Sequence, residues 1–506
     1  MVFSPGITPK MSIAATTEPV LNLPSPADAA RLRSFFVEAG YSIDNMLKVM
    51  GIVELPSVLL RNLARMLDRT KELTSLNGLL RWFWAGVALE ESEAVKVGPQ
   101  WFLDLCCACK LLRKEGKQFV PEVMVVPFEE FLVTSDRTSR FETAEPDLVL
   151  WPNPTSRLLA RFAIRRHSRA TLDVGTGTGV QALMAAKHSD RVIATDLNAR
   201  ALGLAAFNAR LNGIENIEFR FGDGFAPVAD EKFDLIVSNP PFFITPSDHY
   251  LFCDNPMELD QLCRLLTRDA ATHLNEGGYF QMLCEWAEIR DEPWQKRVSE
   301  WFEGTGCDAW VLKGQTRTAS QYAQDRARET VSSPDQGALI YHEHMAYYAE
   351  KNVEAIHDGI IAMRRHSGTN WVLIEGISHT PNYPFGDCVA GGFAARDFLQ
   401  ANSTAEQMLA IRPVLSEHAR IEHVLGHGVG GWQGISLTLK MARGFPFSFE
   451  VQPLVAEFLG SCDGVRTLDE LVKPFAEKVS TPIEQVQKEC IDVLRILIAQ
   501  GYVVWK

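Results

Sequence analysis

The feature that most constrains the fold is a glycine-rich turn between a short apolar strand and a helix, in the stretch TLDVGTGTGVQALMAA. Gly175, Gly177 and Gly179 follow the strand directly, and glycine lets a backbone turn tightly and approach a ligand closely. The next apolar run, RVIATD, ends in Asp196, about twenty residues further on. An acidic residue at that place can accept hydrogen bonds from ribose hydroxyls. The pattern predicts a nucleotide-binding α/β fold.

The surrounding sequence supports this fold class, because apolar strands alternate with amphipathic helices from about residue 146 to residue 365. Such alternation is typical of a mostly parallel sheet. The predicted strands are ATLDVG, RVIATD, IEFRFGD, FDLIVSN, GGYFQMLCEW, DAWVLKG and VEAIHDGIIAMRR.

A dinucleotide-binding oxidoreductase is the natural alternative, and the glycine spacing disfavours it. The third glycine comes one residue too early for the phosphate fingerprint Gly-x-Gly-x-x-Gly, and Asp173 precedes the loop. A third predicted strand ends in FRFGDGF, which places Asp223 where an adenine ring could be contacted.

A fourth strand runs directly into the tetrapeptide Asn239-Pro240-Pro241-Phe242. The prolines end the strand and fix the local backbone, so the asparagine side chain is held in place. An amide or exocyclic amine nitrogen is a poor nucleophile, because its lone pair is delocalised. Hydrogen bonds from its N–H groups to the Asn239 oxygen and the Pro240 carbonyl would orient it for attack. Phe242 would offer a stacking face for a planar group.

These motifs resemble those of class I methyltransferases, and residues 152–286 resemble the methyltransferase small-domain family. That family includes the HemK-type release-factor glutamine methyltransferases and the ribosomal-RNA guanine-N2 enzymes, and DNA adenine-N6 methyltransferases share the tetrapeptide. The resemblance implies a Rossmann-like central domain, S-adenosylmethionine as cofactor, and Asn239, Pro240 and Phe242 as the catalytic residues. It implies donor contacts at Thr155, Asp173, Gly175, Gly177, Gly179, Asp196, Asp223 and Asn239.

Two positions depart from the HemK pattern. In NPTSRLL, Thr155 falls where that group has Thr-Glu, but Ser156 replaces the acid. Phe242 stands where the release-factor enzymes have Tyr, which favours the RNA-type members.

The chain of 506 residues has room for flanking modules. We predict a flexible tail over residues 1–27, a winged-helix-like module over 28–144 and a methyltransferase domain over 145–374. A mixed β-rich region follows over 375–450, and a second winged-helix-like module over 451–506. In the last module, Thr467 and Glu470 have the spacing of a helix capping box.

Composition limits the partners. The net charge of −13 argues against a protein that coats nucleic acid. No run of eighteen apolar residues predicts a membrane helix, so we expect a cytoplasmic protein. The ten cysteines are scattered, which indicates free thiols. Cys106, Cys107 and Cys109 are expected as side chains of a helix over 101–112, and no metal is predicted.

Further candidates remain open. The basic residues beside the glycine loop fit either a solvated helix face or a phosphate-contacting patch; they are Arg157, Arg161, Arg165, Arg166, His167 and Arg169. His342, His344 and His427 are interpreted as structural. Gln321 and Tyr322 are expected to face the substrate pocket.

The favoured function is N-methylation of a planar nitrogen, in an RNA base or a protein glutamine. A small-molecule or peptide methyltransferase, or a non-catalytic S-adenosylmethionine-binding or nucleic-acid-binding module, is the alternative. The oligomeric state is left open.

Overall fold

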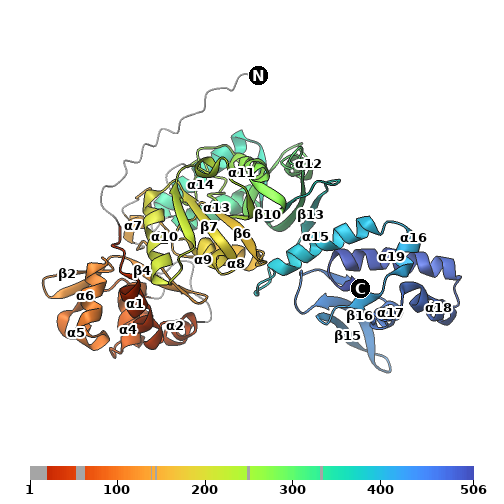
Figure 1. The fold of residues 1–506 in the computed structure, drawn as a ribbon, viewed down its shortest axis with the longest axis horizontal. Coiled ribbons are helices and arrows are strands. Elements are labelled where there is room, and N and C mark those ends of the chain that lie inside the picture. The colour runs from red at the N-terminus through yellow and green to blue at the C-terminus, as the bar shows by residue number, and fades with distance from the viewer. Residues whose placement is uncertain are drawn as a thin grey trace, which may run out of the picture. The chain divides into compact units, whose positions relative to one another are not determined.

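The computed structural model describes residues 20–52, 63–137, 139–142, 145–247, 251–330 and 334–505 (Figure 1). Of the predicted tail, only residues 20–27 fall within these ranges. The chain divides into two compact units, and each is described by itself. The first unit comprises Met1–Ser156 with Arg169–Glu258, and the second comprises Arg157–Ser168 with Leu259–Lys506.

The first unit begins with a helical module that also carries short strands. Its helices are α1 (Pro26–Glu38), α2 (Ile43–Met50), α3 (Leu63–Arg69), α4 (Ser75–Leu79), a π-helical turn over Leu80–Trp84, α5 (Glu91–Val97), α6 (Gln100–Ala108) and α7 (Ser139–Glu142). Its strands are β1 (Leu89–Glu90), β2 (Leu112–Glu115), β3 (Gln118–Pro121), β4 (Met124–Phe128) and β5 (Phe131–Ser135). Strands β1, β3 and β2 form one small sheet, and β4 and β5 form a separate hairpin. The winged-helix interpretation of this module stays a prediction.

One expectation for this module is wrong. Residues 101–112 do not form one helix, because α6 ends at Ala108 and Leu112 already belongs to β2. Lys110 adopts a left-handed backbone conformation with φ of 62°, which a helix cannot continue through. From Leu112 onward the chain pairs with β3 instead, with Leu112 opposite Pro121.

The remainder of the first unit is an α/β layer with four parallel strands. It contains β6 (Ser168–Val174), α9 (Val180–Ala186), β7 (Ser189–Asp196), α10 (Ala199–Leu211), β8 (Ile217–Phe221), a 3-10 turn (Ala226–Val228) and β9 (Phe233–Ser238). The strand order is β9-β6-β7-β8, with β6 parallel to β9 and β7 parallel to β8. The chain runs from β6 to β7 and β8 on one side of β6 and then crosses to β9 on the other side. Such a switch in strand order is where α/β folds bind ligands.

Helix α10 joins the two parts of the first unit into one hydrophobic core, and Figure 1 shows it beside α1 and the β4–β5 hairpin. Its buried apolar side chains belong to the same cluster as those of α1, α6 and the hairpin; they are Ala201, Leu204, Phe207 and Leu211. The same helix and its C-cap also carry three polar side chains that bind the N-terminal module. Arg200 pairs with the buried Asp136, while Asn208 and Asn212 bind the backbone of β5.

The second unit begins with the remaining strands of the central domain and ends in a separate α/β region. The central part contains α11 (Gln261–Thr272), β10 (Leu274–Ile289), α12 (Trp294–Ser299), β11 (Cys307–Thr318), α13 (Ala319–Thr330), α14 (Pro334–Glu350), β12 (Val353–Arg365) and β13 (Val372–Gly376). Its strand order is β13-β11-β12-β10, and β12 runs antiparallel to both neighbours. Helix α8 (Pro154–Phe162) begins in the first unit and continues into the second.

The C-terminal region packs around one hydrophobic cluster that draws residues from Ala395 to Val503. It contains α15 (Gly386–Ala401), α16 (Ala405–Ala410), β14 (Pro413–Leu415), β15 (Ala419–Gly428), β16 (Gly431–Met441), β17 (Ser448–Glu450), α17 (Pro453–Gly460), α18 (Leu468–Val479), α19 (Ile483–Ala499) and β18 (Val503–Trp505). The predicted capping box is confirmed, since Thr467 and Glu470 satisfy each other's backbone N–H groups. Because this core includes residues on both sides of position 450, the predicted boundary there stays a proposal.

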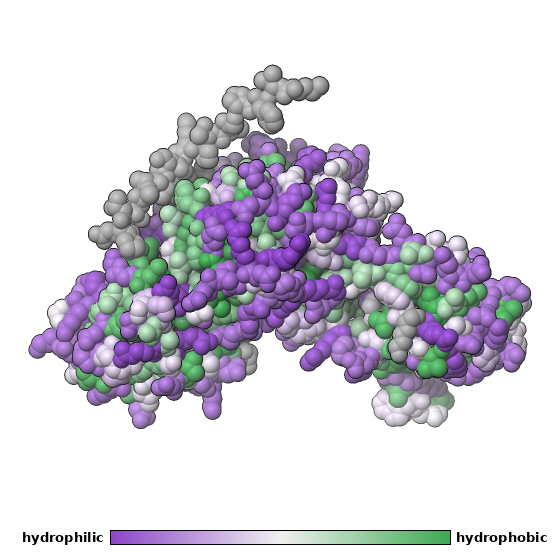
Figure 2. Space-filling view, viewed as in Figure 1, coloured by the Kyte–Doolittle hydropathy of each residue, from purple (hydrophilic) through white to green (hydrophobic). Residues whose placement is uncertain are grey.

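The hairpin of β15 and β16 carries an apolar tip. Val429 is fully exposed, and Trp432 and Ile435 are 71% and 68% exposed. Figure 2 shows the hairpin as pale and green atoms on an otherwise largely hydrophilic surface. His427 lies at this tip against Trp432, with ring centroids 5.8 Å apart.

Two further expectations concern the whole chain. All ten cysteines are free thiols, and Cys106 and Cys109 are buried. Among the described helices, none is both long and apolar enough to cross a membrane.

Candidate functional site

The glycine loop between β6 and α9 has the geometry of a ligand cradle. Gly175, Gly177 and Gly179 have φ values of 71°, 54° and 82°, a region that other residues rarely adopt. A Cβ on Gly179 would lie 2.9 Å from the Cβ of Ala205, so this glycine permits close packing on α10. A Cβ on Gly175 or Gly177 would meet no heavy atom within 4 Å. The loop therefore leaves open space over its first two glycines.

Asp173 braces this loop from inside. Its carboxylate accepts hydrogen bonds from the Thr176 hydroxyl at 2.6 Å and from the Ala182 N–H at 3.0 Å. Burial raises the pKa of Asp173 to about 7, and the two hydrogen bonds oppose that shift. A direct contact between Asp173 and a donor stays a prediction.

Asp196 ends β7 and faces the same loop. One carboxylate oxygen accepts the Gly177 N–H at 2.8 Å, and the other accepts the Asn198 N–H at 2.8 Å. Desolvation raises the pKa of Asp196, and the backbone hydrogen bonds oppose this. Each oxygen keeps a further lone pair, so ribose hydroxyls could still bind here. Asp223, two residues beyond the end of β8, is exposed.

The tetrapeptide follows β9 and is held at several points. The Ser238 hydroxyl donates to the Val174 carbonyl at 2.9 Å, which ties the end of β9 to the end of β6. The Asn255 amide donates to the Pro241 carbonyl at 2.9 Å. Phe242 is only 9% exposed and lies edge-on to Phe243, so its role as a stacking face stays a prediction.

Asn239 has one satisfied and one unsatisfied end. Its amide nitrogen donates to the Thr155 hydroxyl oxygen at 3.4 Å. Its oxygen is buried and has no hydrogen-bond partner among the residues that the structure describes. A buried amide oxygen without a partner costs free energy, so a site of this kind is suited to a ligand that brings a donor.

The structure brings most of the predicted residues to one edge of the first unit. The glycine loop, Asp196, Asp223 and Asn239 follow the carboxyl ends of four parallel strands, where α/β folds bind ligands. Thr155 joins them through its contact with Asn239.

Sequence reasoning missed three asparagines that hold this arrangement, namely Asn153, Asn208 and Asn255. A signal for Asn153 was present, because Asn-Pro before a helix is the pattern of an N-cap followed by proline in the first turn. For Asn208 and Asn255 no local signal exists, because their partners are distant in the sequence.

The expectation that Gln321 faces a substrate pocket stays a prediction, and for Tyr322 it is wrong, because that side chain is fully buried. Gln321 caps the start of α13, since its side chain accepts the Thr318 N–H at 3.0 Å and its own N–H donates to the Thr318 hydroxyl. Tyr322 is fully buried and donates a short hydrogen bond to Glu285, which Arg317 also contacts at 2.9 Å.

The basic residues beside the glycine loop divide between the units. Arg169 pairs with Asp234 at 3.2 Å, and Arg165 donates to the carbonyl of Ala160 at 3.0 Å. Arg166 and His167 are exposed. His344 binds the Ile340 carbonyl of its own helix at 2.8 Å.

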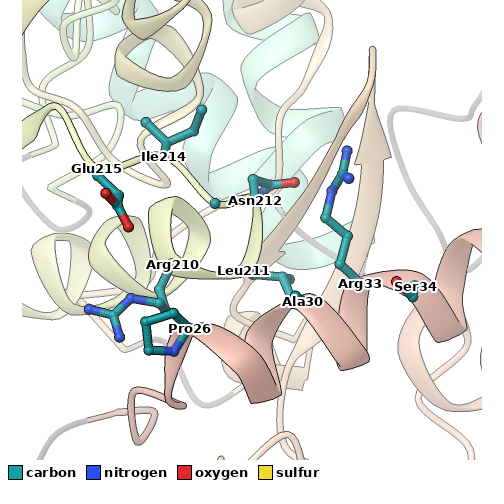
Figure 3. A pocket seen from close by; sticks show the side chains of 10 residues that line it. Pro26, Ala30, Arg33, Ser34, Arg210, Leu211, Asn212, Ile214 and Glu215 are labelled. Carbon is teal, nitrogen blue, oxygen red and sulfur yellow. The ribbon is translucent and has the colours of Figure 1, made fainter.

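Two other features of the described residues have the shape or the residue types of a site. A cavity of about 200 Å³ lies between the start of α1 and the end of α10 (Figure 3). Its two arginines, Arg33 and Arg210, donate to the backbone carbonyls of Glu130 and Pro24, so neither is a dedicated ligand group.

In the second unit Asp308, His366 and Asp397 could hold a metal by distance alone. The Arg364 guanidinium already lies 2.7 Å and 2.6 Å from the two carboxylates.

Two family models match the chain. Residues 152–288 match the methyltransferase small domain. Residues 390–505 match a domain of unknown function, DUF7782.

Three similar curated proteins each match about a quarter of this chain. A release factor glutamine methyltransferase from Xylella fastidiosa is 36% identical over 154 residues, which cover 27% of this chain and 56% of that protein. A ribosomal protein uL3 glutamine methyltransferase from Bradyrhizobium diazoefficiens is 32% identical, with 26% and 46% covered. A tRNA1(Val) (adenine(37)-N6)-methyltransferase from Actinobacillus pleuropneumoniae is 34% identical, with 23% and 47% covered. The chain thus spans about half the length of these relatives.

Proposed function

Residues 152–288 form a class I methyltransferase domain, and from this premise we propose that the chain methylates a planar amide or amine nitrogen with S-adenosylmethionine. The acceptor class is a protein glutamine side chain or an exocyclic amine of an RNA base. One observation carries the proposal: Asn239 presents a buried oxygen without a partner among the described residues, at the end of β9.

The family match confirms the predicted Rossmann-like fold of the central domain and the predicted cofactor, while the winged-helix interpretation of the flanking modules stays a prediction. The residues also fit S-adenosylmethionine on geometric grounds. Gly175 and Gly177 leave open space where side chains would stand, and Asp196 retains lone pairs for ribose hydroxyls. The donor, when bound, supplies an electrophilic methyl group on a sulfonium.

The chain's own residues would prepare the acceptor. The Asn239 oxygen would accept an N–H of the acceptor and so align the nitrogen lone pair with the methyl group. Because the lone pair of an amide or aryl amine is delocalised, this hydrogen bond gains strength as the nitrogen becomes pyramidal. The two prolines and the Asn255 contact to the Pro241 carbonyl keep the tetrapeptide backbone fixed.

The activities for which these relatives are named support the acceptor class. Two of them act on glutamine and one on adenine, and all three acceptors carry an NH₂ group attached to a π-system. The Asn239 oxygen recognises that shared feature. It does not distinguish a glutamine from a base, so selection must involve other parts of the chain.

The test compares the wild type with N239A, using tritiated S-adenosylmethionine and cell extract divided into protein, RNA and small-molecule fractions. N239A should lose at least about 100-fold in turnover, in line with loss of one preorganised hydrogen-bond partner, and far less than that in donor affinity. N22A is a matched control, because the Asn22 amide donates only to the Ala108 carbonyl of the same unit. Unchanged turnover in N239A would reject the mechanism, and label confined to small molecules would reject both acceptors.

A further inference from the structure

The orientation of the Asn239 amide can be traced back to a backbone N–H at the start of α8. Asn153 precedes this helix, and its side-chain oxygen accepts the Ser156 N–H at 3.0 Å. A backbone N–H can only donate, so the atom of Asn153 that faces it must be the amide oxygen. This contact removes the usual ambiguity between the two ends of an asparagine side chain.

The Thr155 hydroxyl lies between Asn153 and Asn239, so the direction of its hydrogen bond to Asn153 determines which atom of Asn239 can face it. This hydroxyl lies 2.6 Å from the same Asn153 oxygen, which has no proton to offer. The single hydroxyl proton of Thr155 must therefore point at Asn153. The Thr155 oxygen then has only lone pairs left for Asn239, whose facing atom lies 3.4 Å away.

Only one orientation of Asn239 satisfies this arrangement. If its oxygen faced Thr155, two oxygens would meet with no proton between them. With the nitrogen facing Thr155, the Asn239 oxygen points away, and this is the buried atom that has no partner among the residues described. The start of α8 is itself anchored, because the Gln181 amide of α9 donates to the Ser156 carbonyl at 2.8 Å.

We propose that Asn153 and Thr155 are positioning residues that fix which end of the Asn239 amide faces the methyl acceptor. This inference rests on the proposed function and deepens it. It gives Thr155 a role through Asn239, beside the donor contact predicted from the family resemblance. We call the hydrogen bonds from Thr155 to Asn153 and from Asn239 to Thr155 the relay. Without the relay, the Asn239 amide can turn by half a rotation, and its nitrogen then opposes the acceptor N–H.

The variants separate loss of the relay from loss of volume. T155V keeps the shape of the side chain and removes the oxygen, while T155S restores the hydroxyl. N153A removes the oxygen that orients the Thr155 proton, while N153D keeps an acceptor at the same place. T171V is a matched control, since Thr171 is a buried threonine of the same unit whose hydroxyl pairs with Ser189 at 2.7 Å.

The first readout requires no acceptor. In protein labelled with ¹⁵N-asparagine, the side-chain NH₂ signals of Asn239 are those absent from the N239A spectrum. T155V and N153A should both shift these signals away from their wild-type position, whereas T155S and N153D should keep them close to it. T171V should leave them in place.

The second readout is methyl transfer from tritiated S-adenosylmethionine to the extract fraction labelled by the wild type. T155V and N153A should lower turnover about tenfold, the usual effect of one hydrogen bond, and N153A should leave donor affinity unchanged. T155S and N153D should recover most of the activity.

Different results would contradict the relay and the proposed function. Unmoved Asn239 signals in T155V, or equal behaviour of N153A and N153D, would overturn the relay even in an active enzyme. Signals that shift as expected in a protein that labels neither protein nor RNA would support the relay and reject the proposed acceptors.

Discussion

Replacement of Asn208 by leucine tests whether the N-terminal module supports the glycine loop. Asn208 lies on α10 with 0% exposure and uses its full hydrogen-bonding capacity. Its oxygen accepts the Thr134 N–H at 2.7 Å and the Thr134 hydroxyl at 2.6 Å. Its nitrogen donates to the carbonyls of Thr134 and Thr178, at 3.0 Å and 2.9 Å. Thr134 belongs to the module's hairpin, and Thr178 belongs to the glycine loop.

The magnitude follows from the groups that lose a partner. N208L leaves one backbone N–H and two carbonyls buried and unpaired, and each such group costs about 1–3 kcal/mol. The Thr134 hydroxyl can rotate toward another acceptor, and the added apolar burial offsets part of the loss. We expect a net destabilisation of about 4 kcal/mol for the opening of this part of the first unit.

A matched variant at Asn212 separates the effect on the glycine loop from the effect on β5. Asn212 is the C-cap of α10, one turn beyond Asn208, and binds the Leu132 N–H at 3.0 Å and the Leu132 carbonyl at 2.8 Å. It is half-buried, and its side-chain hydrogen bonds go to the backbone of Leu132 and Asn208 rather than to the glycine loop. Water can replace its hydrogen bonds, so N212L should cost only about 1 kcal/mol.

The assay is hydrogen–deuterium exchange over residues 131–135, which reports the local opening free energy, together with calorimetric titration of S-adenosylmethionine. N208L should lower that opening free energy far more than N212L does and weaken donor affinity about tenfold, because the Thr178 carbonyl loses its anchor. Equal effects of the two variants, or an unchanged donor affinity in N208L, would refute this reasoning.

Two further predictions concern the glycine loop and a buried carboxyl. G177A should weaken donor binding by about tenfold, because alanine at φ of 54° costs about 1–2 kcal/mol; G213A carries similar strain away from the loop and should not. Equal donor affinities in G177A and wild type would contradict this. Burial raises the pKa of Glu285 to about 7, so folding holds a proton that the unfolded chain releases near pH 4.5. The wild type should therefore lose roughly 3 kcal/mol relative to E285Q as pH rises from 4.5 to 7, seen as a growing gap in Tm; a gap independent of pH would exclude a raised pKa.

The sequence predicted the parts of the site that are contiguous in the chain. The glycine loop, the acid at the end of β7 and the tetrapeptide each follow a strand directly, so the local pattern carries their geometry. The relay could not be predicted in this way. Thr155 and Asn239 are 84 residues apart, and nothing near either residue indicates that they meet.

The sequence also did not indicate which polar side chains within helices are buried and hydrogen-bonded. Asn208 reads as an ordinary polar position in ARALGLAAFNARLNG, and only the packing of β5 on α10 makes it a buried four-way contact. The helix expected over 101–112 failed for a related reason, because pairing between β2 and β3 overrides the helical pattern after Lys110.

Because α10 shares its hydrophobic core with the N-terminal module, the stretch that matches the methyltransferase family is shorter than the stretch that packs as one core. The matched family begins at residue 152, yet Leu204, Phe207 and Leu211 of α10 are covered by side chains from before residue 137. A fragment cut at the family boundary would expose this apolar face to water, together with Asn208, whose partner Thr134 would be lost. We therefore expect the smallest stable fragment that contains the glycine loop to begin near α1, well before the start of the family match at residue 152.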